Sequence, residues 1–237
     1  MPRNLFLVGA LALWCGHASA ADFCPTVADS QNFGLQYQLQ GAQQGNLQLL
    51  RSHAQTAYYN PDNGVGEWWD FKQASHPNFY RVFSQQQRRI DYYTGDLRTL
   101  NIHVSQTEIE SFAANNLRQQ LTLVGDGACA DSQRYQGDYQ GVHYELLWSN
   151  SLQLPLSLST RRNDRTQQWQ ATAVLSGEQV TQQLQQWQQF TDTDYADIGD
   201  NETDPFLAQM INQGFVEHSE HAVYNSQGQP LQGAHQH

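Results

Sequence analysis

Lysine is nearly absent from this sequence, and positive charge as a whole is scarce. Lys72 is the only lysine among 237 residues, and 12 basic residues stand against 23 acidic ones, for a formal net charge of −11. Nucleic acids and anionic lipid surfaces attract proteins through clustered positive charge. The composition therefore predicts no nucleic-acid partner and no electrostatic attachment to an anionic membrane. The excess of acid fits a protein kept in solution outside the cytoplasm.

Long apolar runs are also lacking, with one short exception at the start of the chain. Leu5–Trp14 is apolar, follows the positive charge of Arg3 and precedes small residues at 18–20. Such a run of about ten residues is too short for a membrane span, which needs roughly 20, but it is typical of a secretory signal peptide. We expect residues 1–20 to be a cleaved signal, leaving a periplasmic chain without a transmembrane segment.

Cysteine occurs three times in the sequence. Cys15 lies inside the predicted signal, and the bulky Trp14 before it disfavours a lipid-modified cysteine. The remaining pair, Cys24 and Cys129, is interpreted as one disulfide formed in an oxidising compartment. A redox or metal site would place its cysteines close in sequence, whereas these two are far apart.

Sequence signatures of catalysis are missing as well. The chain has no G-x-S-x-G elbow, no H-E-x-x-H zinc motif and no glycine-rich phosphate loop. His53, His76, His103 and His143 are scattered, and each is interpreted as an ordinary surface or half-buried residue. We therefore expect a protein that is not an enzyme.

What the sequence does contain is a series of short extended segments separated by turn residues. Gly, Pro, Asn and Asp cluster between them, as at Asn60–Gly64, which is the pattern of an antiparallel meander. In Leu152–Thr160, alternate leucines predict one buried face, while Pro155 predicts an edge strand or a bulge. The predicted strands are Gly34–Gln40, Leu47–Arg51, Gln55–Tyr59, Glu67–Phe71, Phe79–Phe83, Arg89–Tyr93, Val142–Trp148, Leu152–Thr160 and Gln168–Leu175.

Three helices are predicted among these strands, over Ser105–Leu117, Ser176–Thr191 and Pro205–Asn212. Ser105 and Glu108 form a capping box at the start of the first. The second segment has a helical stripe but could also be an exposed strand, and the helix is the favoured interpretation. Asp204 caps the third helix and Gly214 ends it.

Together these elements predict a mainly β protein. We expect one curved antiparallel sheet, a half-open barrel covered by one to three short helices, within a single domain over residues 21–227. Residues 228–237 are expected to form a disordered tail.

The stretch from Gly64 to Tyr93 is unusually rich in aromatic residues. Because side chains alternate along a strand, Trp68 and Trp69 are expected on opposite faces of the sheet, and large apolar groups fall on both faces of neighbouring strands. A solvated antiparallel sheet has one apolar face. This sheet is therefore either covered on both sides or lines a cavity for an apolar ligand, and both interpretations stay open.

A later hairpin carries a family resemblance. Leu154-Pro155 opens a strand, Asn163-Asp164 forms a polar turn, and a second strand runs through Trp169. With the signal, the meander and the middle helix, this hairpin resembles the periplasmic lipoprotein-carrier family over Gly34–Leu175. The resemblance implies a half-open barrel closed by helices around an apolar cavity that shields acyl chains. The cavity-wall residues that it implies are Trp68, Trp69, Phe71, Phe79, Tyr80 and Phe83.

Acidic residues are concentrated between Asp192 and Asp204, where carboxylate oxygens could bind calcium. The EF-hand pattern fails, because Asp197 stands where the loop needs glycine. Acids before a helix also favour its positive end, so helix capping and a solvated loop explain the stretch without an ion. The candidate calcium ligands are Asp197, Asp200, Glu202 and Asp204.

Histidines gather near the C-terminus, at His218, His221, His235 and His237. The spacing of His218 and His221 can place two imidazoles around one Zn²⁺ or Cu²⁺. The other two fall in the expected tail, where histidines commonly bind metal only loosely.

The sequence leads to two main functional hypotheses. The first is an exported, non-catalytic carrier or binding protein with an apolar cavity for a lipid or the acyl group of a lipidated protein, and with no resident cofactor. The alternative is a periplasmic copper- or zinc-binding protein that uses the C-terminal histidines. A third is a structural partner of an envelope protein, with the aromatic face as its interface.

Overall fold

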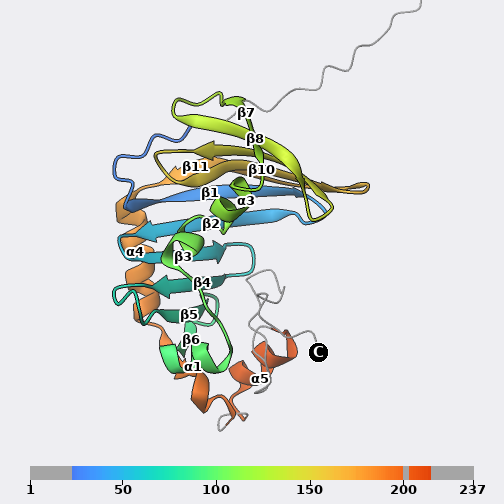
Figure 1. The fold of residues 1–237 in the computed structure, drawn as a ribbon. Helices are drawn as coiled ribbons and strands as arrows, with labels where there is room; N and C mark the ends of the chain where they lie inside the picture. Colours follow the sequence, from blue (N-terminus) through green and yellow to red (C-terminus); the bar gives the residue numbers. More distant parts are fainter. Residues whose placement is uncertain (1–22, 200–202, 215–237) are drawn as a thin grey trace, which may run out of the picture.

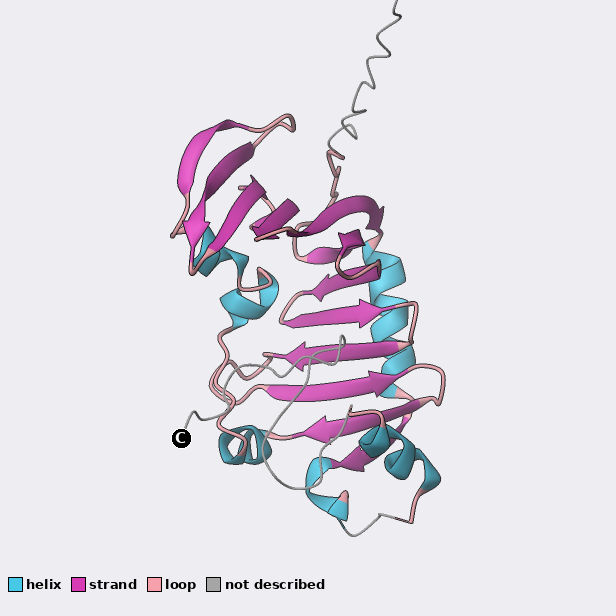
Figure 2. Ribbon diagram, turned by 90° about the vertical axis from the view of Figure 1, so that its right-hand side faces the viewer, coloured by secondary structure: helices cyan, strands magenta, loops and turns pink. Residues whose placement is uncertain are grey.

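The protein is built on one open, mostly antiparallel β-sheet, shown by a computed structural model that describes residues 23–199 and 203–214 (Figure 1). Its twelve strands follow the order β12-β6-β5-β4-β3-β2-β1-β11-β10-β9-β8-β7. Each neighbouring pair is antiparallel except β12 and β6, which are parallel. The predicted mainly β fold with a curved, unclosed sheet is confirmed. Figure 2 shows the upper strands turning toward the side where short helices lie.

The strands agree closely with those predicted over residues 34–93 and 142–175. Each predicted strand there is present within a few residues of its expected ends. Three further strands, β7, β8 and β12, were not predicted. The strands are β1 Asn32–Gly41, β2 Gly45–Ser52, β3 Gln55–Asn60, β4 Val65–Asp70, β5 Asn78–Phe83, β6 Arg88–Tyr92, β7 Thr122–Asp126, β8 Ser132–Tyr139, β9 Val142–Ser149, β10 Leu154–Arg162, β11 Arg165–Leu175 and β12 Thr191–Asp194.

Five α-helices accompany the sheet in the described residues, more than the one to three expected. They are α1 Thr94–Thr99, α2 Gln106–Glu110, α3 Ala114–Arg118, α4 Gly177–Gln188 and α5 Pro205–Asn212, with a 3-10 turn, η1, at Tyr195–Asp197. None of them is both long and apolar enough to cross a membrane.

The single helix predicted over Ser105–Leu117 was wrong, although its capping box of Ser105 and Glu108 is present. The chain breaks between α2 and α3 because Phe112 and Ala113 both adopt a left-handed backbone with φ of 55°. This turn places the Phe112 ring in a stack on Tyr58, with ring centroids 4.6 Å apart. Burial of an aromatic ring on the sheet thus overrides local helix propensity.

Helix α4 resolves the ambiguous segment in favour of the helix. Ser176 accepts a hydrogen bond from the backbone N–H of Gln179, and the Gln179 side chain accepts one from the backbone N–H of Ser176. The buried stripe is the predicted one: Val180, Leu184 and Trp187. Figure 2 shows α4 on one face of the sheet, with α1, α2 and α3 on the other.

Strand β10 shows the bulge that Pro155 predicts, but it is an interior strand between β9 and β11 rather than an edge. The pairing with β9 shifts register between Pro155 and Ser157. As a result the alternate leucines do not share one cluster: Leu154 packs with the core near β1, whereas Leu156 packs with Cys129 and Leu147. Leu152, Leu154 and Leu156 are buried, as the alternation predicted, whereas Leu158 is half-buried.

A disulfide joins Cys24 to Cys129, as predicted, with the two Cα atoms 5.3 Å apart. It links the chain before β1 to the loop between β7 and β8. Such a bond is typical of an oxidising, extracytoplasmic compartment. The predicted signal peptide and the predicted tail lie outside the described residues.

Candidate functional site

The residues implied as cavity walls lie on β4 and β5, with Phe71 directly after the end of β4, and the structure divides them between the two faces of the sheet. Strand alternation puts the neighbours Trp69 and Trp68 on opposite sides, as expected. We call these sides the Trp69 face and the Trp68 face. Trp69, Phe71, Phe79 and Phe83 belong to the cluster on the first, and Trp68 and Tyr80 to the cluster on the second.

The Trp69 face is an aromatic cluster closed by helices. The ring centroids of Trp69 and Phe79 are 4.6 Å apart. Phe83 meets Phe206 of α5 edge to face, with centroids 5.2 Å apart. Leu207 and Met210 of α5 and Leu97 of α1 complete the same cluster. Short helical segments therefore cover this face where the wall residues lie.

The Trp68 face is covered by α4. Trp68 lies between Tyr80 and Trp187, with ring centroids at 4.6 and 6.4 Å. Val180 and Leu184 of α4 pack on Leu50 and Ala57 of the neighbouring strands. Of the two interpretations left open by the sequence, a sheet covered on both sides describes this region in the structure.

An ion pair lies buried within the Trp69 face. Arg81 Nη2 donates to Glu67 Oε1 at 3.3 Å, and the two side chains are only 1% and 4% exposed. The guanidinium carbon of Arg81 lies 5.7 Å from the centre of the Phe79 ring. Tyr92, in the same cluster, is also buried, and its own burial raises its pKa to about 12. The apolar face thus has a charged but paired centre, which is costly to desolvate.

A cluster of carboxylates lies at the β6–β12 edge of the sheet. Parallel pairing sets Asp194 beside Asp91 and Asp192 beside Arg89. The carboxylate oxygens of Asp91, Asp192 and Asp194 lie within 4.8 Å of one another, which is a spacing that a metal ion could bridge. Burial raises the pKa of Asp91, and the neighbouring Arg89 partly offsets this. Arg89 already binds both oxygens of Asp91, at 2.8 and 3.2 Å, so a cation here would compete with it.

The calcium ligands expected from the sequence have other surroundings. Asp204 caps α5 and pairs with Arg88 Nη2 at 2.8 Å, which confirms the capping interpretation for this residue. Asp197 is exposed in η1, and Asp200 and Glu202 lie outside the described residues. The zinc or copper candidates His218 and His221 also lie outside them, so metal binding by the histidines stays a prediction.

Sequence reasoning missed Asp91 as a member of an acidic cluster. The parallel pairing of β6 with β12 joins segments about a hundred residues apart, and no local sequence pattern predicts it. The alternation Thr-Asp-Thr-Asp at 191–194 is a signal that could have been used, because it places two carboxylates on one face of a strand.

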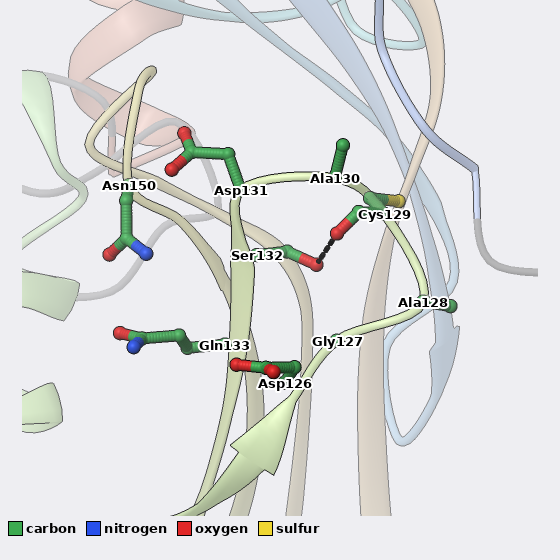
Figure 3. Close-up of a pocket in the computed structure, with 9 residues that line it drawn as sticks. All are labelled: Asp126, Gly127, Ala128, Cys129, Ala130, Asp131, Ser132, Gln133 and Asn150. Atoms are coloured by element: carbon green, nitrogen blue, oxygen red, sulfur yellow. Dashed lines mark hydrogen bonds between the residues drawn. The ribbon is translucent and has the colours of Figure 1, made fainter.

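Two of the pockets formed by the described residues are lined mainly by polar groups. The first, of about 520 Å³, lies beside the disulfide loop and is lined by Asp126, Gly127, Ala128, Cys129, Ala130, Asp131, Ser132, Gln133 and Asn150 (Figure 3). The second, of about 430 Å³, is lined by Asp70, Lys72, Gln73, His76, Asn78, Tyr93, Thr94 and Gly95. Neither is lined by the aromatic residues implied as cavity walls, and five of those six residues are buried in the packed clusters.

Comparison with known proteins yields only distant structural similarity. No protein-family model and no curated protein matches this chain. Two crystal forms of a protein named PNGF-II are similar in structure, each at 12% identity, with TM-scores of 0.38 and 0.39. They align with 72% and 69% of this chain but with only 32% and 31% of their own. A similarity at this level carries no argument about function.

Proposed function

We propose that the protein is an exported, non-catalytic binding protein of the periplasm that holds an apolar group, such as a lipid or the acyl chain of a lipidated protein, on the Trp69 face. The observation that carries the proposal is the aromatic cluster on this face and the way it is closed. Near β4–β6 this face is covered by short helices, α5 and α1, rather than by a second sheet layer.

Helix α5 is the cover whose displacement would open the site. It contributes Phe206, Leu207 and Met210 to the cluster and is held at its start by the ion pair between Asp204 and Arg88. An acyl chain that took the place of these three side chains would meet Phe83 and the rings beyond it. The apolar area lost when α5 moves would be replaced by ligand area, so that the exchange costs little hydrophobic free energy.

The buried ion pair gives the same face a means of orienting a ligand. Glu67 and Arg81 lie among the aromatic rings of this cluster, on the strands that carry the wall residues. A ligand with a polar head and an apolar chain could place its head near this pair and its chain along the rings. A lipid or a lipidated protein has this chemistry, and an envelope protein that delivers or receives it would be the partner.

The two adjacent tryptophans provide a matched test. Trp69→Phe and Trp68→Phe make the same change at neighbouring buried positions, one on each face. Binding of a fatty acid to the mature protein would be measured by calorimetry, after native mass spectrometry has shown whether lipid co-purifies. We expect Trp69→Phe to weaken binding by about tenfold, equivalent to ~1.4 kcal/mol, and Trp68→Phe to change it less than about twofold.

Two results would contradict the proposal. One is that neither fatty acid nor phospholipid binds the protein and none co-purifies. The other is that both variants reduce binding equally while remaining folded by circular dichroism, because the effect would then come from general destabilisation of the sheet and not from contact on the Trp69 face.

A further inference from the structure

Strand β7 forms an edge of the sheet and is unusually exposed to solvent. All five residues of Thr122–Asp126 are exposed, and among the described strands β7 pairs only with β8. Leu123 and Val124 are 51% and 56% exposed, which makes them the most exposed large apolar side chains of the described chain. An edge strand presents a row of unpaired backbone groups, and natural proteins commonly block such edges.

Strand β12, at the opposite edge of the sheet, has features that oppose pairing with a further strand. Strand β12 has four residues, two of which are aspartates, and the carboxylate cluster lies against it. Strand β7 has neither Lys, Arg nor Pro, and its one charged residue, Asp126, stands at its end. Its one protective feature is a bulge, where the pairing with β8 shifts register between Leu123 and Gly125. A further strand could therefore pair with β7 over a short length.

The distribution of charge favours a second copy of this chain as the occupant. Residues 114–175, which contain α3 and β7 to β11, carry five arginines and five acids, so this part of the chain has no net charge, while the chain as a whole has a net charge of −11. The arginines are Arg118, Arg134, Arg161, Arg162 and Arg165, and the acids are Asp126, Asp131, Asp138, Glu145 and Asp164. Two copies would repel each other through their other halves but not through this one. A basic partner, by contrast, would be drawn to the acidic half.

We propose that β7 pairs with β7 of a second copy, antiparallel and across a two-fold axis, so that two sheets join edge to edge. The antiparallel direction follows from Asp126. It sets the two Asp126 carboxylates at opposite ends of the paired strands, whereas parallel pairing would set these like charges side by side. The contact is isologous, as in most protein dimers, and it covers Leu123 and Val124 of both copies.

The association is weak, because the paired edge is short. A strand of five residues with a bulge buries less than the roughly 1,200 Å² of a standard interface. We therefore expect a reversible dimer with a dissociation constant of about 100 µM, which corresponds to ~5.5 kcal/mol of binding free energy. The monomer is the species present in dilute solution.

Sedimentation equilibrium of the mature protein tests the proposal, with Val124→Lys as the disrupting variant and Thr191→Lys as its control. Both residues are exposed, and they lie on opposite edge strands. From about 10 µM to 1 mM, the weight-average mass of the unmodified protein and of Thr191→Lys should rise toward that of a dimer, while Val124→Lys stays monomeric. A monomer at every concentration, or a dimer that Val124→Lys leaves unchanged, would overturn the proposal.

A second pair of variants reports on the strand itself. Val124 is the central residue of β7, so it lies near the two-fold axis in a register that pairs most of the strand. We expect Val124→Cys to form an intermolecular disulfide under mild oxidation at about 500 µM, with at least about fivefold more cross-linked dimer than Thr191→Cys. Equal cross-linking of the two variants would mean random collision and would contradict pairing at β7.

Discussion

Strands β4 and β7 belong to the same sheet but have opposite surroundings. Residues Val65–Trp69 of β4 are all buried, including a glutamate, whereas all residues of β7 are exposed, including a leucine and a valine. Composition does not explain the difference, because both strands contain glycine, apolar residues and an acid. The helices explain it, because they lie over both faces of β4, whereas β7 is at the edge of the sheet. Helix placement in this protein thus decides which strands form core.

The largest expected effect comes from removing a ring from the covered half of the sheet. Trp69→Ala should lower the free energy of unfolding by about 3–5 kcal/mol, because a large cavity forms in a packed cluster. Val124→Ala on β7 should change it by less than about 0.5 kcal/mol, because the side chain is exposed. Urea denaturation followed by circular dichroism measures both. If the two losses were similar, the contrast between the strands would be wrong.

The second prediction concerns the buried charges of the covered half. Arg81→Met should cost about 3–5 kcal/mol, because it leaves Glu67 buried without this partner. The double variant Glu67→Leu/Arg81→Met should recover most of that loss. Arg161→Met, in the exposed part of β10, is the matched control and should cost less than about 0.5 kcal/mol. A double variant as unstable as Arg81→Met would show that the ion pair itself stabilises the fold.

The disulfide offers a smaller and more local effect, because it ties the β7–β8 loop to the start of the chain. Replacing Cys24 and Cys129 by serine should cost about 2–4 kcal/mol. Hydrogen exchange should then accelerate more in β7 and β8 than in β4 and β5, since the latter keep their helical cover. A uniform acceleration over all four strands would mean that the two halves of the sheet unfold together.

The sequence predicted the half of the fold that depends on local patterns. Turn residues and alternation predicted β1 to β6 and β9 to β11, and the caps predicted α4 and α5. Strand β8, by contrast, lacks a clear apolar alternation because its side chains are mostly solvated. The break at Phe112 and Ala113 depends on a ring docking on Tyr58, and the acidic cluster depends on β12 pairing with β6. These are contacts between distant segments, which a local pattern does not encode.

The smallest expected effect is a pH dependence of stability that comes from Asp204, at the start of helix α5 over the Trp69 face. The hydrogen bond from Arg88 holds the pKa of Asp204 below its usual value, with help from the backbone N–H of Phe206 at the start of α5. A carboxyl group with a lowered pKa in the folded state stabilises the protein above its ordinary pKa of about 3.9, and this contribution is lost as the pH falls through the folded value.

Asp204→Asn isolates the charge in this interaction, because asparagine can still cap α5. At pH 7 it should cost about 0.2–1 kcal/mol, the range of a partly exposed ion pair. The difference from the unmodified protein should shrink as the pH falls below about 4, where Asp204 begins to bind a proton. Thermal unfolding at a series of pH values measures this difference. A difference that stayed constant down to about pH 2 would show that the aspartate acts on α5 through shape and not through its charge.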